Sequence, residues 1–108
     1  LYVISVFFIV LRYNISMKNT QMEELLKVLI VAGKDKALLK AFIEDLFTPK
    51  ELEEIPTRWQ IVKRINKGEP HSKIAKDLHI GVGTVTRGSV ELKDAKGGFA
   101  QMLKKMKN

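Results

Sequence analysis

The spacing of apolar residues constrains the fold most strongly, because from Met17 onward it follows a helical period. In MEELLKVLIVAGK, residues 22–34, and again in DKALLKAFIEDLF, residues 35–47, large apolar residues return every three or four positions. Gly33 and Asp35 stand between the two stretches as a candidate C-cap and N-cap. Such spacing gathers apolar side chains on one helix face, and no useful length of the chain shows the alternation of a strand. We therefore predict an all-α domain with about six helices.

Capping residues predict where a further helix begins and ends. Thr48 is a good N-cap, Pro49 suits the first helical position, and Glu51 completes a capping box. Pro56 should then interrupt the helix, because proline lacks an N–H and its ring clashes with the carbonyl four residues earlier. The helical period resumes in TRWQIVKRINKG, and Gly68 can end it.

The first eleven residues, LYVISVFFIVL, form an apolar run unlike the rest of the chain. A bilayer span needs about 20 such residues. A secretory signal would carry a basic flank before the run and a small-residue cleavage site after it. Because MKNTQMEELL at Met17 resembles an ordinary start, we expect residues 1–16 not to belong to the working protein and residues 17–108 to form its domain. A short interfacial anchor is the alternative for the extension.

Charge is distributed unevenly along the chain, which bears on its partners. Residues 17–56 carry six lysines and eight acidic residues, a net charge of −2. Residues 57–108 carry twelve lysines or arginines and four acidic residues, a net charge of +8, and Arg12 brings the total to +7. A basic half beside a mildly acidic one indicates a polyanion partner, most often nucleic acid. On composition alone, a solvated lysine-rich surface is an equal alternative.

The sequence at about 71–93 has the spacing of a helix-turn-helix. HSKIAKDL is predicted to form a short helix, HI a tight turn, and GVGTVTRGSVELK the start of a second helix. Small Ala75 allows the helices to approach closely, and Val85, ten residues later, fills the space between them. His79 stands at the turn position where glycine is common, and histidine adopts positive φ more readily than most residues. An ordinary helical hairpin is the alternative.

The second helix of this motif begins with small, uncharged residues. A recognition helix enters the major groove by its N-terminal end. Glycines there allow close approach, while threonines offer hydroxyls and methyl groups to bases. Basic residues lie at the flanks, where phosphates would be met. The residues predicted to contact DNA are His71, Ser72, Lys73, Lys76, Gly81, Val82, Gly83, Thr84, Thr86 and Lys93.

The sequence shows no catalytic or metal-binding pattern. The chain has no cysteine, which excludes disulfides and thiolate zinc sites, and its two scattered histidines are too few for a convincing metal site. It also lacks a phosphate-binding glycine loop, a nucleophile elbow and a paired-carboxylate site. We therefore expect a binding protein without a metal, and not an enzyme.

LFTPKELEEIPTRWQIVKRINKGEPHSKIAKDLHIGVGTVTRGSVELK, residues 46–93, resembles the tryptophan operon repressor family. The matching phrases are LFTPKE, TR before an apolar helix, GE before the first helix of the motif, and TVTRGS followed by LK. The resemblance implies an intertwined all-α homodimer in the cytoplasm. It also implies a repressor that binds operator DNA when loaded with L-tryptophan and blocks transcription of tryptophan-biosynthesis genes. No membrane partner is expected.

The resemblance also implies a tryptophan site. Arg58 and Arg87 would sandwich the indole ring, and a planar guanidinium stacks well on an aromatic face. Arg87 would also pair with the ligand carboxylate, and Gly88 would leave space beside the ring. Backbone carbonyls near Phe47 and Thr48 of the other subunit would receive the ligand amine.

The sequence departs from the family pattern at several positions. Glu91 stands where the family often has a serine that binds the ligand amine; a glutamate could accept from this amine or repel the carboxylate. Val90 replaces a frequent asparagine, and Pro56 lies within what the family builds as one long helix. The first alternative is therefore a related DNA-binding regulator that responds to another ligand or to none. An alternative of another class is a helical module whose basic half binds an acidic protein.

Overall fold

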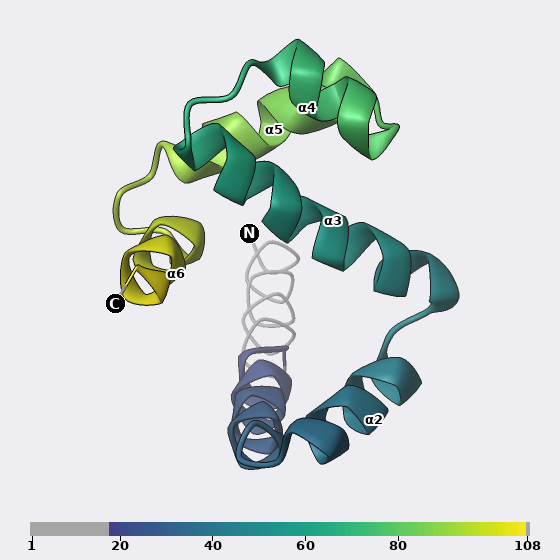
Figure 1. The fold of residues 1–108 in the computed structure, drawn as a ribbon. Coiled ribbons are helices and arrows are strands. Elements are labelled where there is room, and N and C mark those ends of the chain that lie inside the picture. Colours follow the sequence, from purple (N-terminus) through teal and green to yellow (C-terminus); the bar gives the residue numbers. More distant parts are fainter. Residues whose placement is uncertain (1–17, 108) are drawn as a thin grey trace, which may run out of the picture. The chain divides into compact units, whose positions relative to one another are not determined.

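The computed structural model describes residues 18–107, which divide into two compact units between Leu46 and Phe47. The prediction for residues 1–16 lies outside the described residues. All regular structure from 18 to 107 is helical and comprises six helices, which confirms the all-α prediction. They are a helix over residues 18–32, α2 at Lys36–Leu46, α3 at Pro49–Asn66, α4 at His71–Leu78, α5 at Val82–Leu92 and α6 at Gly98–Met106 (Figure 1).

The first unit is a pair of helices with little core of its own. Asp35 caps α2 as predicted, because its Oδ1 accepts from the backbone N–H of Ala37 at 3.1 Å and of Leu38 at 3.3 Å. Ala32 is the only buried residue among residues 18–46. The large apolar side chains left exposed here are those of Met22, Leu26, Val28, Ile30, Val31, Leu38 and Leu46. Two helices that expose this much apolar surface need a further partner surface.

The second unit begins with α3, and its N-terminus has the predicted capping box. The N–H of Glu51 donates to Thr48 Oγ1 at 3.2 Å, and the N–H of Thr48 donates to Glu51 Oε1 at 2.9 Å. The prediction that Pro56 interrupts the helix is wrong, because α3 runs unbroken through it. A proline removes one backbone bond and costs about 3 kcal/mol. Ile61 and Val62 are buried in the second half of the helix, and their packing offsets the lost backbone bond.

Two residues with a left-handed backbone conformation shape the connections on either side of α4. Gly68 has a φ of 85° and ends α3, and the N–H of Glu69 closes this end by donating to Arg64 O at 3.2 Å. His79 has a φ of 57°, as the sequence predicted, and the N–H of Ile80 donates to the carbonyl five residues earlier at 3.0 Å. Both bonds satisfy carbonyls at a helix C-terminus. The positive φ of His79 and the backbone bond of Ile80 therefore fix the turn between α4 and α5.

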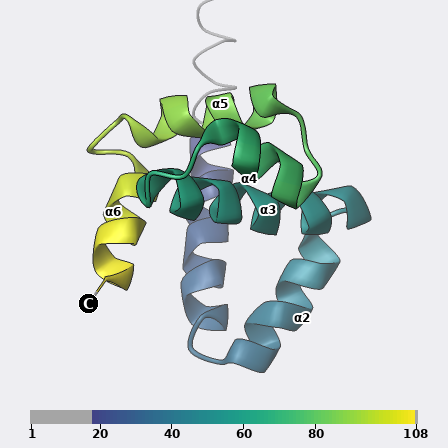
Figure 2. The same cartoon turned by 45° about the horizontal axis from the view of Figure 1, so that its top comes forward.

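The core of the second unit lies where α4 and α5 pack across α3. Ala75 and Val85 belong to one buried cluster, as expected for residues that lie between the two helices. The other members are Ile61 and Ile74, with Ile65, Leu78 and Ile80 packed against them. Figures 1 and 2 both show α4 and α5 side by side over the C-terminal half of α3. α6 adjoins this layer, and the Phe99 ring lies 6.5 Å from that of Trp59 on α3.

Candidate functional site

The residues predicted to contact DNA lie on or next to α4 and α5. His71, Ser72, Lys73 and Lys76 fall within α4, and all but half-buried His71 are exposed. The exposed residues at the start of α5 are Gly81, Val82, Gly83, Thr84 and Thr86, and exposed Lys93 follows this helix. The structure therefore places both predicted sets, the basic flank and the small residues, on one helix-turn-helix.

Gly81 and Gly83 leave a bare surface at the start of α5. Among the described residues Gly68 is the only glycine with positive φ, so neither position needs glycine for its backbone conformation. A Cβ atom added at Gly81 or at Gly83 would meet no atom of residues 18–107 within 4 Å. Because no contact among the described residues requires these glycines, they favour close approach of a partner surface.

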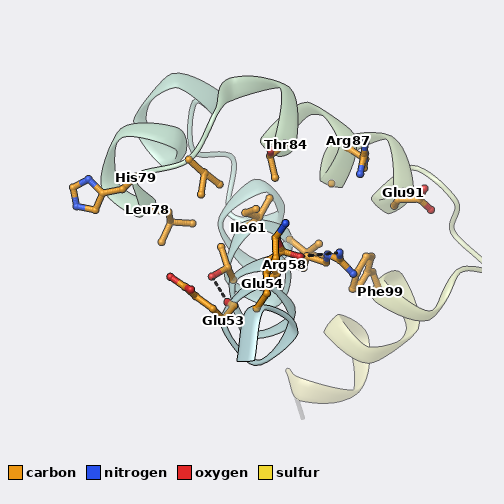
Figure 3. Close-up of a pocket in the computed structure, with 15 residues that line it drawn as sticks. Glu53, Glu54, Arg58, Ile61, Leu78, His79, Thr84, Arg87, Glu91 and Phe99 are labelled. Atoms are coloured by element: carbon orange, nitrogen blue, oxygen red, sulfur yellow. Dashed lines mark hydrogen bonds and ion pairs between the residues drawn. The ribbon is translucent and has the colours of Figure 1, made fainter. Parts of the chain in front are cut away.

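The two threonines of α5 have different surroundings. Thr86 is exposed, and its hydroxyl donates to Val82 O within the same helix at 3.1 Å. Thr84 lines a cleft between α3 and α5, and its side chain points toward Ile61 (Figure 3). Thr84 therefore adjoins the predicted ligand site as well as the predicted DNA surface.

The cleft has a volume of about 660 Å³ and lies between α3, the end of α4, α5 and α6. Arg58 lines it from α3, while Arg87 and Glu91 line it from α5 (Figure 3). Its apolar lining includes Ile61 and Phe99. The cleft thus joins an apolar surface to cations and carboxylates on two different helices.

The two arginines of the cleft are held differently. Arg58 is 61% exposed and lies 3.9 Å from Glu54 Oε2, one turn earlier on α3. Arg87 makes no side-chain hydrogen bond or ion pair with any residue of the described range, and the same holds for Glu91, one turn later on α5. Two opposite charges therefore stand open toward the cleft.

The structure does not bring every predicted ligand residue into this cleft. Arg58, Arg87, Gly88 and Glu91 line it, whereas Phe47 and Thr48 lie at the start of α3 and do not. Gly88 is also a point of close helix contact, because a Cβ atom there would lie 2.9 Å from Ile61 Cγ2. Its lack of a side chain therefore sets the approach of α5 to α3.

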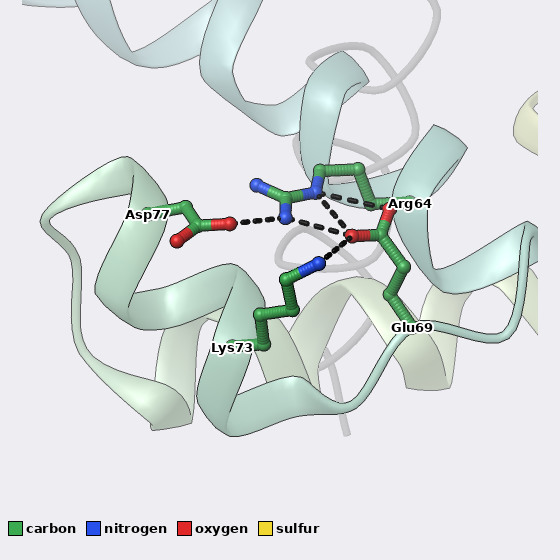
Figure 4. Close-up of polar contacts among 4 residues, drawn as sticks. All are labelled: Arg64, Glu69, Lys73 and Asp77. Carbon is green, nitrogen blue, oxygen red and sulfur yellow. Dashed lines mark hydrogen bonds and ion pairs between the residues drawn. The ribbon is translucent and has the colours of Figure 1, made fainter.

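A charged network between α3 and α4 was missed by the sequence analysis. Arg64 Nη2 lies 2.7 Å from Glu69 Oε1 and also donates to Asp77 Oδ2, while Lys73 Nζ lies 3.7 Å from Glu69 Oε1 (Figure 4). Hydrogen bonds from Arg64 lower the pKa of both carboxyl groups. A lowered pKa in the folded state means that this stabilisation is present at neutral pH and is lost as the pH falls through the folded pKa.

The described residues show neither a metal cluster nor a membrane span. Between residues 18 and 107, no three histidine, aspartate or glutamate side chains come together in a way that could hold a metal ion. None of the helices in this range is long and apolar enough to cross a membrane.

A helix-turn-helix with a basic flank defines the class of DNA-binding regulators. The chain matches the family model described as Trp repressor protein over residues 20–107. A Trp operon repressor homolog from Photobacterium profundum is 38% identical over 90 residues, 79% of this chain and 84% of that protein. Another from Mannheimia succiniciproducens is 34% identical over 90 residues, 82% of this chain and 85% of that protein. The chain belongs to the Trp repressor family, whose members are DNA-binding regulators and not enzymes.

Proposed function

We propose that this protein is a cytoplasmic repressor that binds operator DNA when L-tryptophan occupies the cleft, and that it blocks transcription of tryptophan-biosynthesis genes. The observation that carries the proposal is the position of the cleft. It borders α3, which belongs to the core, and α5, which presents the bare surface expected in the major groove. A ligand held there would fix the angle of the recognition helix against the core.

The chemistry of the cleft suits a zwitterion with an aromatic side chain. The guanidinium groups of Arg58 and Arg87 would stack on the indole ring, and Arg87 would pair with the ligand carboxylate. Glu91, which has no partner among the described residues, would accept from the ligand ammonium. Apolar Ile61 and Phe99 would cover the ring edges.

Glu91 also favours the second candidate, a related regulator with a different small-molecule ligand. A full negative charge one turn from Arg87 changes what the cleft accepts, because an anionic group placed near it would be repelled. A ligand that places a cationic group beside Glu91, and no anionic group near it, would then bind better than tryptophan.

We further propose that the protein acts as an intertwined homodimer. The first unit supports this proposal, because α2 has no buried residue and the helix before it has one. A second copy would cover these apolar faces and could bring its Phe47 and Thr48 carbonyls to the ligand ammonium. The two recognition helices could then meet successive major grooves about 34 Å apart.

The dimer predicts a melting temperature that depends on protein concentration. If no stable folded monomer exists, dissociation accompanies unfolding, and the midpoint should rise as the concentration is raised from about 1 to about 100 μM. Circular dichroism at 222 nm across that series measures the shift. A helical, folded monomer in sedimentation velocity runs at micromolar concentration would contradict the proposal.

A gel-shift titration with DNA from upstream of the protein's own gene tests the proposed function. Addition of L-tryptophan should increase the affinity for this DNA, while a random duplex of the same length should be bound weakly and depend steeply on salt. Sequence-specific binding that ignores tryptophan would favour the second candidate. Absence of any DNA binding would instead favour a module that binds an acidic protein.

A further inference from the structure

α4 carries the cations expected at DNA phosphates together with a carboxylate that opposes them. Lys73 and Lys76 are exposed on this helix, and so is Asp77. Asp77 lies four residues after Lys73 and therefore on the same helix face. Glu69 stands just before α4, within 3.7 Å of the Lys73 ammonium. Uncompensated, these two carboxylates would repel the phosphates that the lysines attract.

Arg64, in the last turn of α3, contacts both carboxylates and offsets one of their two negative charges. Its Nε lies 3.1 Å from each carboxylate oxygen of Glu69, and its Nη2 lies 2.7 Å from Oε1. The same Nη2 donates to Asp77 Oδ2 (Figure 4). The Arg64 side chain is only 18% exposed, so its charge lies behind α4 and is directed toward the two acids. With Lys73, the four side chains have no net charge.

We propose that Arg64 is a positioning residue for DNA binding, which offsets one of the two negative charges of Glu69 and Asp77 and so keeps the net charge of the α4 surface positive. This inference rests on the proposed function only in taking α4 as part of the DNA-binding face. Arg64 itself needs no contact with DNA in this role. It acts through Lys73 and Lys76, whose attraction for phosphate the two carboxylates would otherwise cancel.

A purely structural role for the network predicts a different result from charge compensation. If Arg64 and Asp77 served only to hold α4 on α3, removing either one would loosen α4 and weaken DNA binding. Charge compensation predicts that the two variants change the DNA affinity in opposite directions. Arg64→Gln removes a positive charge near the α4 surface, whereas Asp77→Asn removes a negative one. The double variant restores the original net charge although the contact between the two side chains is lost.

The test measures binding of the full chain to a random-sequence duplex without tryptophan, at low and at moderate salt. At low salt, Arg64→Gln should weaken binding roughly 3- to 10-fold, and Asp77→Asn should strengthen it by a similar factor. The double variant should bind within about twofold of the unmodified protein. Both single effects should shrink as salt is raised, because added ions screen exposed charges. Lys40→Gln is the matched control, since it removes one cation and one ion pair, with Glu44, outside this network.

The outcomes separate this inference from the proposed function. Weaker binding by Asp77→Asn, or a double variant as weak as Arg64→Gln, would overturn the role of Arg64, as would equal losses in Arg64→Gln and Lys40→Gln. If Arg64→Gln fails to fold, Asp77→Asn still shows whether removing a negative charge strengthens DNA binding. Arg64→Lys keeps the charge but loses the planar guanidinium, and it should bind DNA nearly as the unmodified protein does. Failure of the unmodified protein to bind any DNA would reject the proposed function itself.

Discussion

Arg87→Ala should weaken L-tryptophan binding by roughly a hundredfold or more, because it removes both a cation–π contact and a charge-assisted bond to the carboxylate. Arg58→Ala should weaken binding less, by about tenfold, since it loses only the stacking contact. Arg58 is also largely exposed and already paired with Glu54, which reduces its share further. Isothermal titration calorimetry without DNA measures both effects.

The absence of DNA is essential to that measurement, because Arg87 could also approach phosphates. Both variants should keep the circular dichroism of the unmodified protein and its weak binding to random DNA. Equal affinities for tryptophan in Arg87→Ala and in the unmodified protein would remove Arg87 from the ligand site. If the unmodified protein itself produces no heat with millimolar tryptophan, then Glu91→Ser is the variant to test next. Recovery of binding in that variant would identify Glu91 as the residue that changes the ligand.

Gly88→Ala and Gly83→Ala should change stability in opposite directions, although both lie in α5. At Gly88 the new methyl group would lie 2.9 Å from Ile61 Cγ2, and Ile61 is a buried core residue that cannot move freely. Forcing α5 away from α3 should cost about 1–3 kcal/mol. At Gly83, the second helical residue of α5, the methyl group meets no atom of the described residues within 4 Å. Alanine there restricts the unfolded chain without strain in the folded one, which should stabilise the protein by about 0.4–1 kcal/mol.

Urea denaturation at a single protein concentration measures these two changes, which keeps any contribution from association constant. The pair controls itself, since each variant adds the same methyl group to the same helix. A loss of stability in Gly83→Ala would show that the start of α5 is constrained by contacts other than those described. An unchanged urea midpoint in Gly88→Ala would mean that α3 and α5 can move apart with little loss of stability. The close contact between Gly88 and Ile61 would then not be needed for the fold.

Local signals in the sequence predicted the ends of several helices correctly. Thr48 with Glu51, and Asp35, cap helices through bonds to residues two or three positions away, so a short window of sequence holds all partners. Gly68 and His79 adopt positive φ for reasons intrinsic to those residue types. Such features need no knowledge of the tertiary structure.

The features that the sequence did not reveal depend on contacts between helices. Arg64 meets Asp77, thirteen residues later, only because α4 turns back across α3. Gly88 contacts Ile61 for the same reason, so its close-contact role could not be separated from a role in the ligand site. At Pro56 the sequence predicted an interruption that the structure does not have. The rule for an isolated helix predicts a break, but packing further along α3 outweighs the lost bond.

The cleft shares its walls between a core helix and the recognition helix, and this has a thermodynamic consequence for the proposed repressor. Whatever factor tryptophan adds to the affinity for operator, operator must add to the affinity for tryptophan, because the two equilibria form one closed cycle. Part of the repressor already on DNA would therefore retain tryptophan at concentrations that leave the free protein empty. The occupied operator would extend the range of tryptophan levels over which repression persists.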